Sequence, residues 1–157
     1  MLIKSKFAQR SMLTVATMAA IFIALPTVTA SAASMTNLSV VAKGKYEKAG
    51  AGAMSGSVTG SFTADLKKNT LCYSVTNHGI KGISGIHIHT GKAGVDGAVA
   101  VALDPMKIGH KGSTCIKVEA KVLADIAAHP SLYYFNAHNA TYPNGAVRAQ
   151  LGKMMTK

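Results

Sequence analysis

Two histidines in the middle of the chain carry the clearest chemical signal. His87 and His89 are two residues apart in an alternating apolar segment, where such residues share one side of a strand about 6.6 Å apart. Imidazoles at that spacing can bind one metal ion at about 2.0–2.1 Å per bond. His138 lies on the polar side of a later strand, beside Asn136. If the two strands are neighbours, three imidazoles meet, which suits copper or zinc better than magnesium or calcium.

A hydrogen-bonded polar patch is the alternative interpretation of the same residues. His87, His89, Asn136 and His138 would then bond to backbone carbonyls beneath a glycine-spaced loop at residues 91–97.

The remaining histidines give weaker signals. His78 and His110 lie in predicted loops and could supply a fourth ligand, but nothing in the sequence selects either. His129 follows a predicted helix, where its cation would stabilise the helix dipole.

Arg148 is the candidate anion-handling residue. It would either guide an anion or clamp a carboxylate, or it would be a structural arginine that satisfies loop carbonyls; we favour the structural role. Asp96, in the glycine-spaced loop, could pair with Arg148 or cap a turn. Tyr133 and Tyr134 are expected to provide core and edge packing.

Other chemistries lack the necessary residues. The sequence has no Gly-x-Ser-x-Gly elbow, phosphate loop or dinucleotide fingerprint. Its six carboxylates are far apart along the chain, and no pair of them indicates a glycosidase. Neither cysteine has the setting of a catalytic thiol.

The elements that would position these residues are mostly strands. Apolar residues alternate with polar ones in seven or so short segments, and glycine- or asparagine-containing turns separate them. Helical spacing occurs only between residues 118 and 129, where Pro130 ends the run. The sequence therefore predicts an all-β fold: a Greek-key or immunoglobulin-like antiparallel β-sandwich with one short helix. The expected strands are residues 38–42, 57–66, 71–76, 83–90, 99–103, 114–118, 133–138 and 146–151.

The alternation also assigns side chains to faces. Ile86 and Ile88 are expected to point inward, with His87 and His89 on the other side of the strand. In the last strand, Arg148 and Gln150 are expected to point outward.

The first 32 residues have the three parts of a secretory signal peptide. A basic start is followed by an apolar run at 12–25 and by small residues before a cleavage after Ala32. The run is shorter than the roughly 20 residues of a membrane span, so we expect no span once the signal is removed; an uncleaved anchor is the alternative. We divide the rest into an N-terminal strand and mobile loop (33–56), a sandwich core (57–152) and a C-terminal tail (153–157).

Length and charge limit the partners. A chain of 157 residues with 48% hydrophobic residues suits one domain with a real core. The formal net charge is +11, but the positive residues are mostly lysines scattered through loops. Proteins that bind nucleic acids usually cluster arginines with aromatic residues. We therefore expect the lysines to form a solvent-exposed surface with some attraction for anions, and we expect no nucleic-acid binding.

The two cysteines point to an oxidising compartment. An even, low count in an exported chain predicts one disulfide, Cys72–Cys115, which would contribute on the order of 4 kcal/mol. Free thiols or soft copper ligands are the alternatives. The expected location is periplasmic or secreted.

Two motifs in order resemble those of the CHRD (chordin) domain. They are GIHIHTGKAGVDG at 85–97, for the first half of that domain, and LYYFNAH at 132–138 with PNGAVRAQL at 143–151, for the second. The resemblance covers roughly residues 38–151. It implies an extracellular β-sandwich module of the kind found in chordin-type and bacterial exported proteins.

A more distant resemblance is to copper–zinc superoxide dismutases. Residues 85–89 look like their copper-ligand strand, residues 144–148 like the segment with their substrate-guiding arginine, and His138 like a third copper ligand. No histidine lies between His89 and His110, so the bridging and zinc-ligand run is missing, as is the family's cysteine shortly after the arginine. The resemblance therefore implies at most a copper-only site.

Together these features favour a binding module over an enzyme. We expect an exported, non-catalytic module with a histidine-based copper site at His87, His89 and His138, with zinc as the second choice. Arg148, Asn136 and Asp96 would support the loop or a bound anion. The alternatives are a copper-only dismutase-like oxidoreductase and a metal-free extracellular interaction module. The expected partner is an envelope or extracellular protein or surface, whose identity the sequence leaves open.

Overall fold

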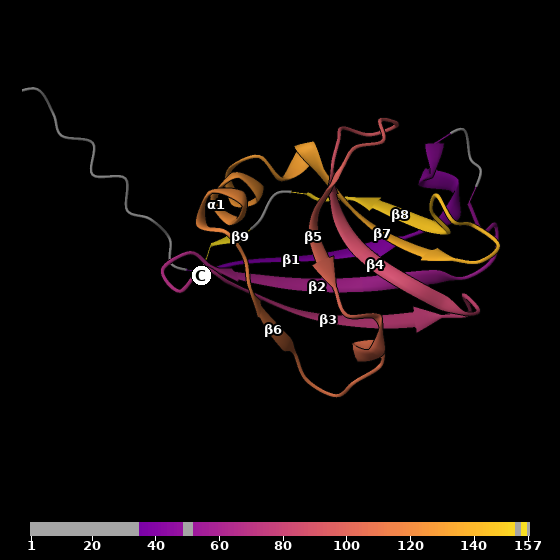
Figure 1. Cartoon of the computed structure of the whole chain (residues 1–157), viewed down its shortest axis with the longest axis horizontal. Helices are drawn as coiled ribbons and strands as arrows, with labels where there is room; N and C mark the ends of the chain where they lie inside the picture. The colour runs from indigo at the N-terminus through magenta and orange to yellow at the C-terminus, as the bar shows by residue number, and fades with distance from the viewer. Residues whose placement is uncertain (1–34, 49–51, 153–154, 157) are drawn as a thin grey trace, which may run out of the picture. The chain divides into compact units, whose positions relative to one another are not determined.

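The computed structural model describes residues 35–48, 52–152 and 155–156, and these form two antiparallel sheets (Figure 1). The first sheet contains, in spatial order, β6 (Thr114–Lys117), β3 (Thr70–His78), β2 (Ser57–Asp65), β1 (Met35–Ala42) and β9 (Met155–Thr156). The second contains β5 (Val99–Leu103), β4 (Ile83–Thr90), β7 (Tyr133–Asn139) and β8 (Val147–Gln150).

The connections match the predicted sandwich. Strands β1, β2 and β3 form a meander, and β6 returns to pair with β3 after the chain has passed through β4 and β5 of the other sheet. The helix α1 (Ala120–Ala128) is the one α-helix among the described residues, and three short 3-10 helices accompany it: η1 (Gly44–Tyr46), η3 (Pro105–Lys107) and η4 (Pro130–Leu132). The prediction of an antiparallel β-sandwich with one short helix is confirmed.

Alternation along the strands builds the core between the sheets. Every second residue of β2 is buried, and Phe62 of β2 meets Phe135 of β7 with ring centroids 5.4 Å apart. Ile86 and Ile88 of β4 are buried as predicted. Because side chains alternate, the residues between them lie on the opposite, outer face of the second sheet.

Val99 departs from the alternation of β5. Its side chain is 50% exposed, whereas Val101 and Leu103 are buried. The pairing of β4 with β5 shifts at this point: Ile88 pairs with Val101, but His89 pairs with Val99. One extra residue in β5 therefore forms a bulge, which reverses the alternation locally.

The disulfide joins two neighbouring strands. Cys72 of β3 and Cys115 of β6 are register partners, and their sulfur atoms are bonded. The predicted pairing is thus confirmed, and it indicates an oxidising environment outside the cytoplasm.

Residues around the helix tie it to the second sheet. Leu123 and Ile126 of α1 are buried in the core. Tyr133 donates a hydrogen bond to Asp125 of the helix, whose carboxylate also lies 2.9 Å from Nδ1 of His129. His129 thus lies at the C-terminal end of α1, where it was expected.

No helix among the described residues is long and apolar enough to cross a membrane. The predicted signal peptide lies outside the described residues.

Candidate metal centre

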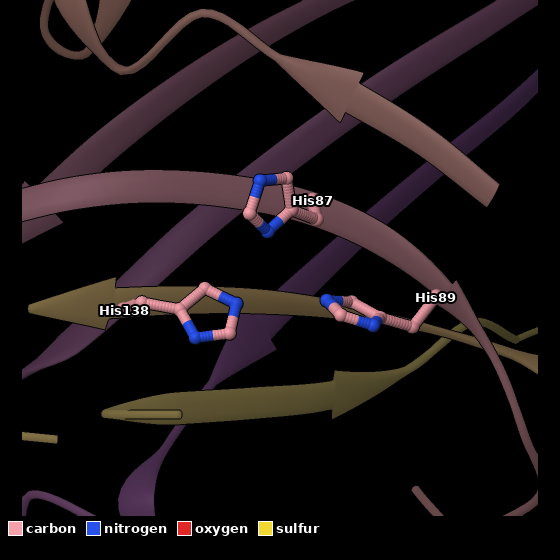
Figure 2. Close-up of side chains that lie close together, drawn as sticks. All are labelled: His87, His89 and His138. Atoms are coloured by element: carbon pink, nitrogen blue, oxygen red, sulfur yellow. The ribbon is translucent and has the colours of Figure 1, made fainter. Parts of the chain in front are cut away.

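Three histidines meet on the outer face of the second sheet (Figure 2). His87 and His89 come from β4, and His138 comes from the neighbouring strand β7, where it pairs with Gly85. The ring centroids of the three imidazoles lie 5.0–5.6 Å apart. Each ring offers one nitrogen such that the three nitrogens all lie within 4.8 Å of one another. The pairing of β4 with β7 thus brings the three predicted ligands together.

Hydrogen bonds from two loops determine which nitrogens are free. Nδ1 of His89 lies 3.0 Å from the carbonyl oxygen of Gly97, and Nδ1 of His138 lies 3.0 Å from that of Pro143. A carbonyl oxygen only accepts, so each Nδ1 carries the proton and each Nε2 keeps its lone pair. Such carbonyl partners typically orient metal-ligating histidines.

Three nitrogens are buried without a hydrogen-bond partner among the described residues. They are Nδ1 of His87, Nε2 of His89 and Nε2 of His138. A buried polar atom without a partner is uncommon in a folded protein and requires an explanation. A metal ion shared by the three lone pairs would satisfy all of them at once.

Two of the imidazoles, those of His87 and His138, are held in the form that binds metal. Burial lowers the pKa of His87 below its ordinary value, and repulsion from protonated His138 and His89 lowers it further. Burial also lowers the pKa of His138, although its hydrogen bond to Pro143 opposes the effect. Neutral imidazole is the ligand form, so at neutral pH no proton has to be displaced from these two rings.

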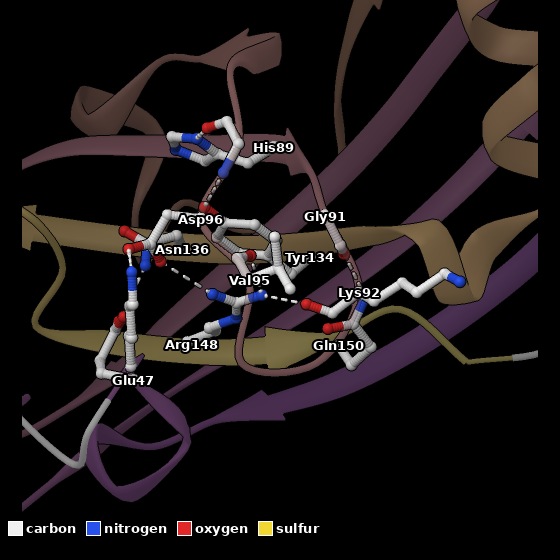
Figure 3. A network of polar contacts seen from close by, with 12 residues as sticks. Glu47, His89, Gly91, Lys92, Val95, Asp96, Tyr134, Asn136, Arg148 and Gln150 are labelled. Carbon is white, nitrogen blue, oxygen red and sulfur yellow. Dashed lines mark hydrogen bonds and ion pairs between the residues drawn. The ribbon is translucent and has the colours of Figure 1, made fainter.

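Arg148 holds the glycine-spaced loop over this face (Figure 3). Its guanidinium donates hydrogen bonds to the carbonyls of Lys92 and Val95, both at 2.9 Å, and to the carboxylate of Asp96 at 3.2 Å. Arg148 does lie on the outer face, as expected, but the loop covers it and only 1% of the residue is exposed. These contacts match the structural role, including the pairing with Asp96.

Tyr134 connects Arg148 to the histidines. Its ring stacks on His89 with centroids 5.0 Å apart and an interplanar angle of 9°, and the guanidinium carbon of Arg148 lies 3.4 Å from its centroid. Its hydroxyl accepts a hydrogen bond from the backbone N–H of Gly97, the residue whose carbonyl orients His89. The sequence predicted only edge packing for Tyr134.

Glu47 is a component of the site that sequence reasoning missed. It follows η1, is 8% exposed, and its carboxylate accepts a hydrogen bond of 2.8 Å from the side-chain amide of Asn136. Burial raises the pKa of Glu47 to about 7, although the charge of Arg148 and the bond from Asn136 oppose the shift. Asn136 itself lies in register between His87 of β4 and Arg148 of β8. Glu47 lies in a segment rich in lysine, glycine and alanine, which gave no sign of burial.

The other candidate ligands lie elsewhere. His78 is exposed and its Nε2 lies 3.2 Å from the hydroxyl of Thr59, while His110 is exposed in the segment after η3. Neither belongs to the three-histidine group.

The donor set fits a transition metal. Three neutral imidazole nitrogens suit copper or zinc, whereas magnesium and calcium prefer oxygen ligands. The three side chains come from two adjacent strands whose geometry is fixed by ladder hydrogen bonds. The cluster could therefore hold one metal ion without rearrangement of the backbone.

Comparison with known proteins gives one match. The family model of the CHRD domain matches residues 33–151. No curated protein and no solved structure matches the chain, so the resemblance to dismutases gains no support from the comparisons.

Proposed function

Starting from the fact that the chain belongs to the CHRD family, we propose that it is an exported module that binds one copper ion without catalysing a reaction. The ligands are Nδ1 of His87, Nε2 of His89 and Nε2 of His138. Two observations carry the proposal: these three buried nitrogens have no partner in the described part of the chain, and the three rings each offer a nitrogen within 4.8 Å of those offered by the other two.

Copper is favoured over zinc by the number and type of ligands. Among divalent ions of this series copper binds nitrogen sites most tightly. Structural zinc sites are almost always closed by four protein ligands, often thiolates. Here both cysteines are joined in a disulfide on the other sheet, the carboxylate of Glu47 is engaged by Asn136, and that of Asp96 pairs with Arg148 and Lys48. The disulfide also supports export, to the periplasm or the extracellular space.

Binding is favoured over catalysis by the state of Arg148. A residue that guides a small anion needs free donors and access to solvent. Arg148 is 1% exposed, and its guanidinium already donates to two carbonyls and one carboxylate. Its contacts therefore support a role in holding the loop.

A copper-dependent oxidoreductase is the second candidate function. Three protein ligands leave further positions of a copper ion open to a substrate, as in catalytic metal sites. The copper-loaded protein would then dismutate superoxide faster than the same amount of free copper. Equal or lower activity eliminates this candidate.

Titration of the mature domain with Cu(I), Cu(II) and Zn(II) tests the proposal. We expect one copper ion per chain with a Kd well below roughly micromolar. His87→Ala should weaken binding by about 100-fold or more, since one of three ligands is lost, whereas the exposed His78→Ala serves as the matched control and should bind normally. Weaker binding in the wild type, or equal binding by His87→Ala, would leave the metal-free interaction module as the function, with pull-down from an envelope fraction as its assay.

A further inference from the structure

A groove separates two strands that belong to different sheets. Lys43, the residue directly after β1, forms an isolated bridge with Arg148 of β8, and their backbone groups exchange hydrogen bonds of 3.1 and 3.2 Å. Beside this bridge lies a cavity of about 420 Å³, which we call the edge groove. Its apolar walls include Leu38, Val40, Val41, Tyr46, Ala93 and Ala149.

Apolar side chains at this groove are open to solvent. Val41 is 47% exposed and Tyr46 is 50% exposed, and both belong to the small set of large apolar residues that the fold leaves uncovered. Exposed aromatic residues beside aliphatic ones are typical of surfaces that bind other molecules. The volume lies within the range of about 300–1,000 Å³ seen for specific ligand sites.

Lysines give the groove a positive border. The ammonium of Lys45 lies 5.0 Å from the centroid of the Tyr46 ring, which lines the groove. Lys43 lies directly before η1, which contains the lining residue Tyr46, and Lys92 lies directly before the lining residue Ala93. Both lysines are exposed. No carboxylate is among the described residues that line the groove; Asp96 pairs with Arg148 and Lys48, and Glu47 is buried. An anionic occupant is therefore favoured.

Gln150 gives the groove a fixed wall at β8. It lines the groove, and its amide nitrogen lies 2.7–2.8 Å from three carbonyl oxygens, those of Gly91, Ser131 and Tyr133, to which its two N–H bonds donate. These contacts hold the side chain in one position.

We propose that the edge groove binds an extended segment of a partner protein in which acidic side chains alternate with apolar ones. The apolar side chains pack against Val41 and Tyr46, and the carboxylates face Lys45 and its neighbouring lysines. Recognition of an extended peptide beside the edges of strands is a recurring mode of protein interaction. The proposal does not depend on metal binding, because none of the three histidines lines the groove.

The direct test uses a blocked peptide of alternating glutamate and valine, added to the ¹⁵N-labelled domain. We expect amide shifts to change at Val41, Tyr46 and Gln150. Tyr46→Ala and Lys45→Glu should each weaken binding by about tenfold. Val99→Ala on β5 and Lys111→Glu in the segment before β6 change exposed residues, so they are the matched controls and should bind as the wild type does.

Control ligands separate this occupant from others. The corresponding lysine–valine peptide should not bind, and palmitate should not displace the acidic peptide. Shifts that map elsewhere, equal binding of the lysine peptide, or displacement by palmitate would each overturn the proposal. His87→Ala should bind the peptide normally, so failure of the copper site and failure of the groove are distinguishable.

Discussion

Replacement of Arg148 by methionine tests how the loop holds the metal centre. Methionine keeps the length and apolar packing of the side chain but removes three hydrogen bonds from a charged donor, each worth about 1.5–3 kcal/mol. Two factors reduce the sum: Asp96 is 58% exposed, and the loop carbonyls can bond to water once the loop loosens. Loss of the contact with Tyr134 adds roughly 1 kcal/mol. We therefore expect Arg148→Met to lower the free energy of unfolding by about 3–5 kcal/mol.

The same change should weaken copper binding through the loop. The carbonyl of Gly97 orients His89, and loss of such a partner typically costs about 10–100-fold in metal affinity. Denaturant unfolding measures the stability, and copper titration of the still-folded variant measures the affinity. Arg148→Lys keeps the charge but cannot bond to three acceptors in one plane, so it should fall between the wild type and Arg148→Met. If Arg148→Met bound copper as tightly as the wild type, the loop would not be positioning His89 and the reasoning would fail.

Three further predictions concern stability. Burial raises the pKa of Glu47 from about 4.5 to about 7, so the stability that protonated Glu47 contributes is present below pH 4.5 and is lost as the pH rises through 7. Denaturant unfolding at acidic and at mildly alkaline pH should therefore show that the free energy of unfolding of Glu47→Gln rises relative to that of the wild type as the pH increases. Joint replacement of Cys72 and Cys115 by serine opens a link between residues 43 positions apart and should lower the free energy of unfolding by about 4 kcal/mol, while copper titration should show an unchanged affinity because the cysteines lie on the other sheet. Gly145 has a φ of 141°, and a Cβ there would lie 2.6 Å from both carboxylate oxygens of Glu47, so thermal unfolding should show Gly145→Ala to be destabilised by more than about 1 kcal/mol.

The strands and the faces of their side chains followed directly from alternation. Period two assigns Ile86 and Ile88 to one face and His87 and His89 to the other, whatever the strand pairs with. The meeting with His138 needed one more fact, the pairing of β4 with β7, which local pattern does not contain. The resemblance of two separate motifs to one family supplied the expectation that both belong to the same domain.

Features that depend on contacts between segments far apart in the sequence were not predicted. Alternation tells which side of β8 Arg148 occupies, but not that the loop between β4 and β5 covers that side. Glu47 reaches Asn136 across 89 positions of sequence, and no local pattern marks such a contact. Val99 does not share the buried face of Val101 and Leu103 because a single bulge shifts the register, and the alternation on either side of a bulge does not reveal it.

X-ray absorption of the mature protein loaded with one equivalent of copper tests the central claim most directly. The account predicts three imidazole nitrogens at about 2.0–2.1 Å from the metal, and fewer in His87→Ala and in His138→Ala. A spectrum with one or no imidazole, or one that neither substitution changes, would show that these three histidines do not form the metal site.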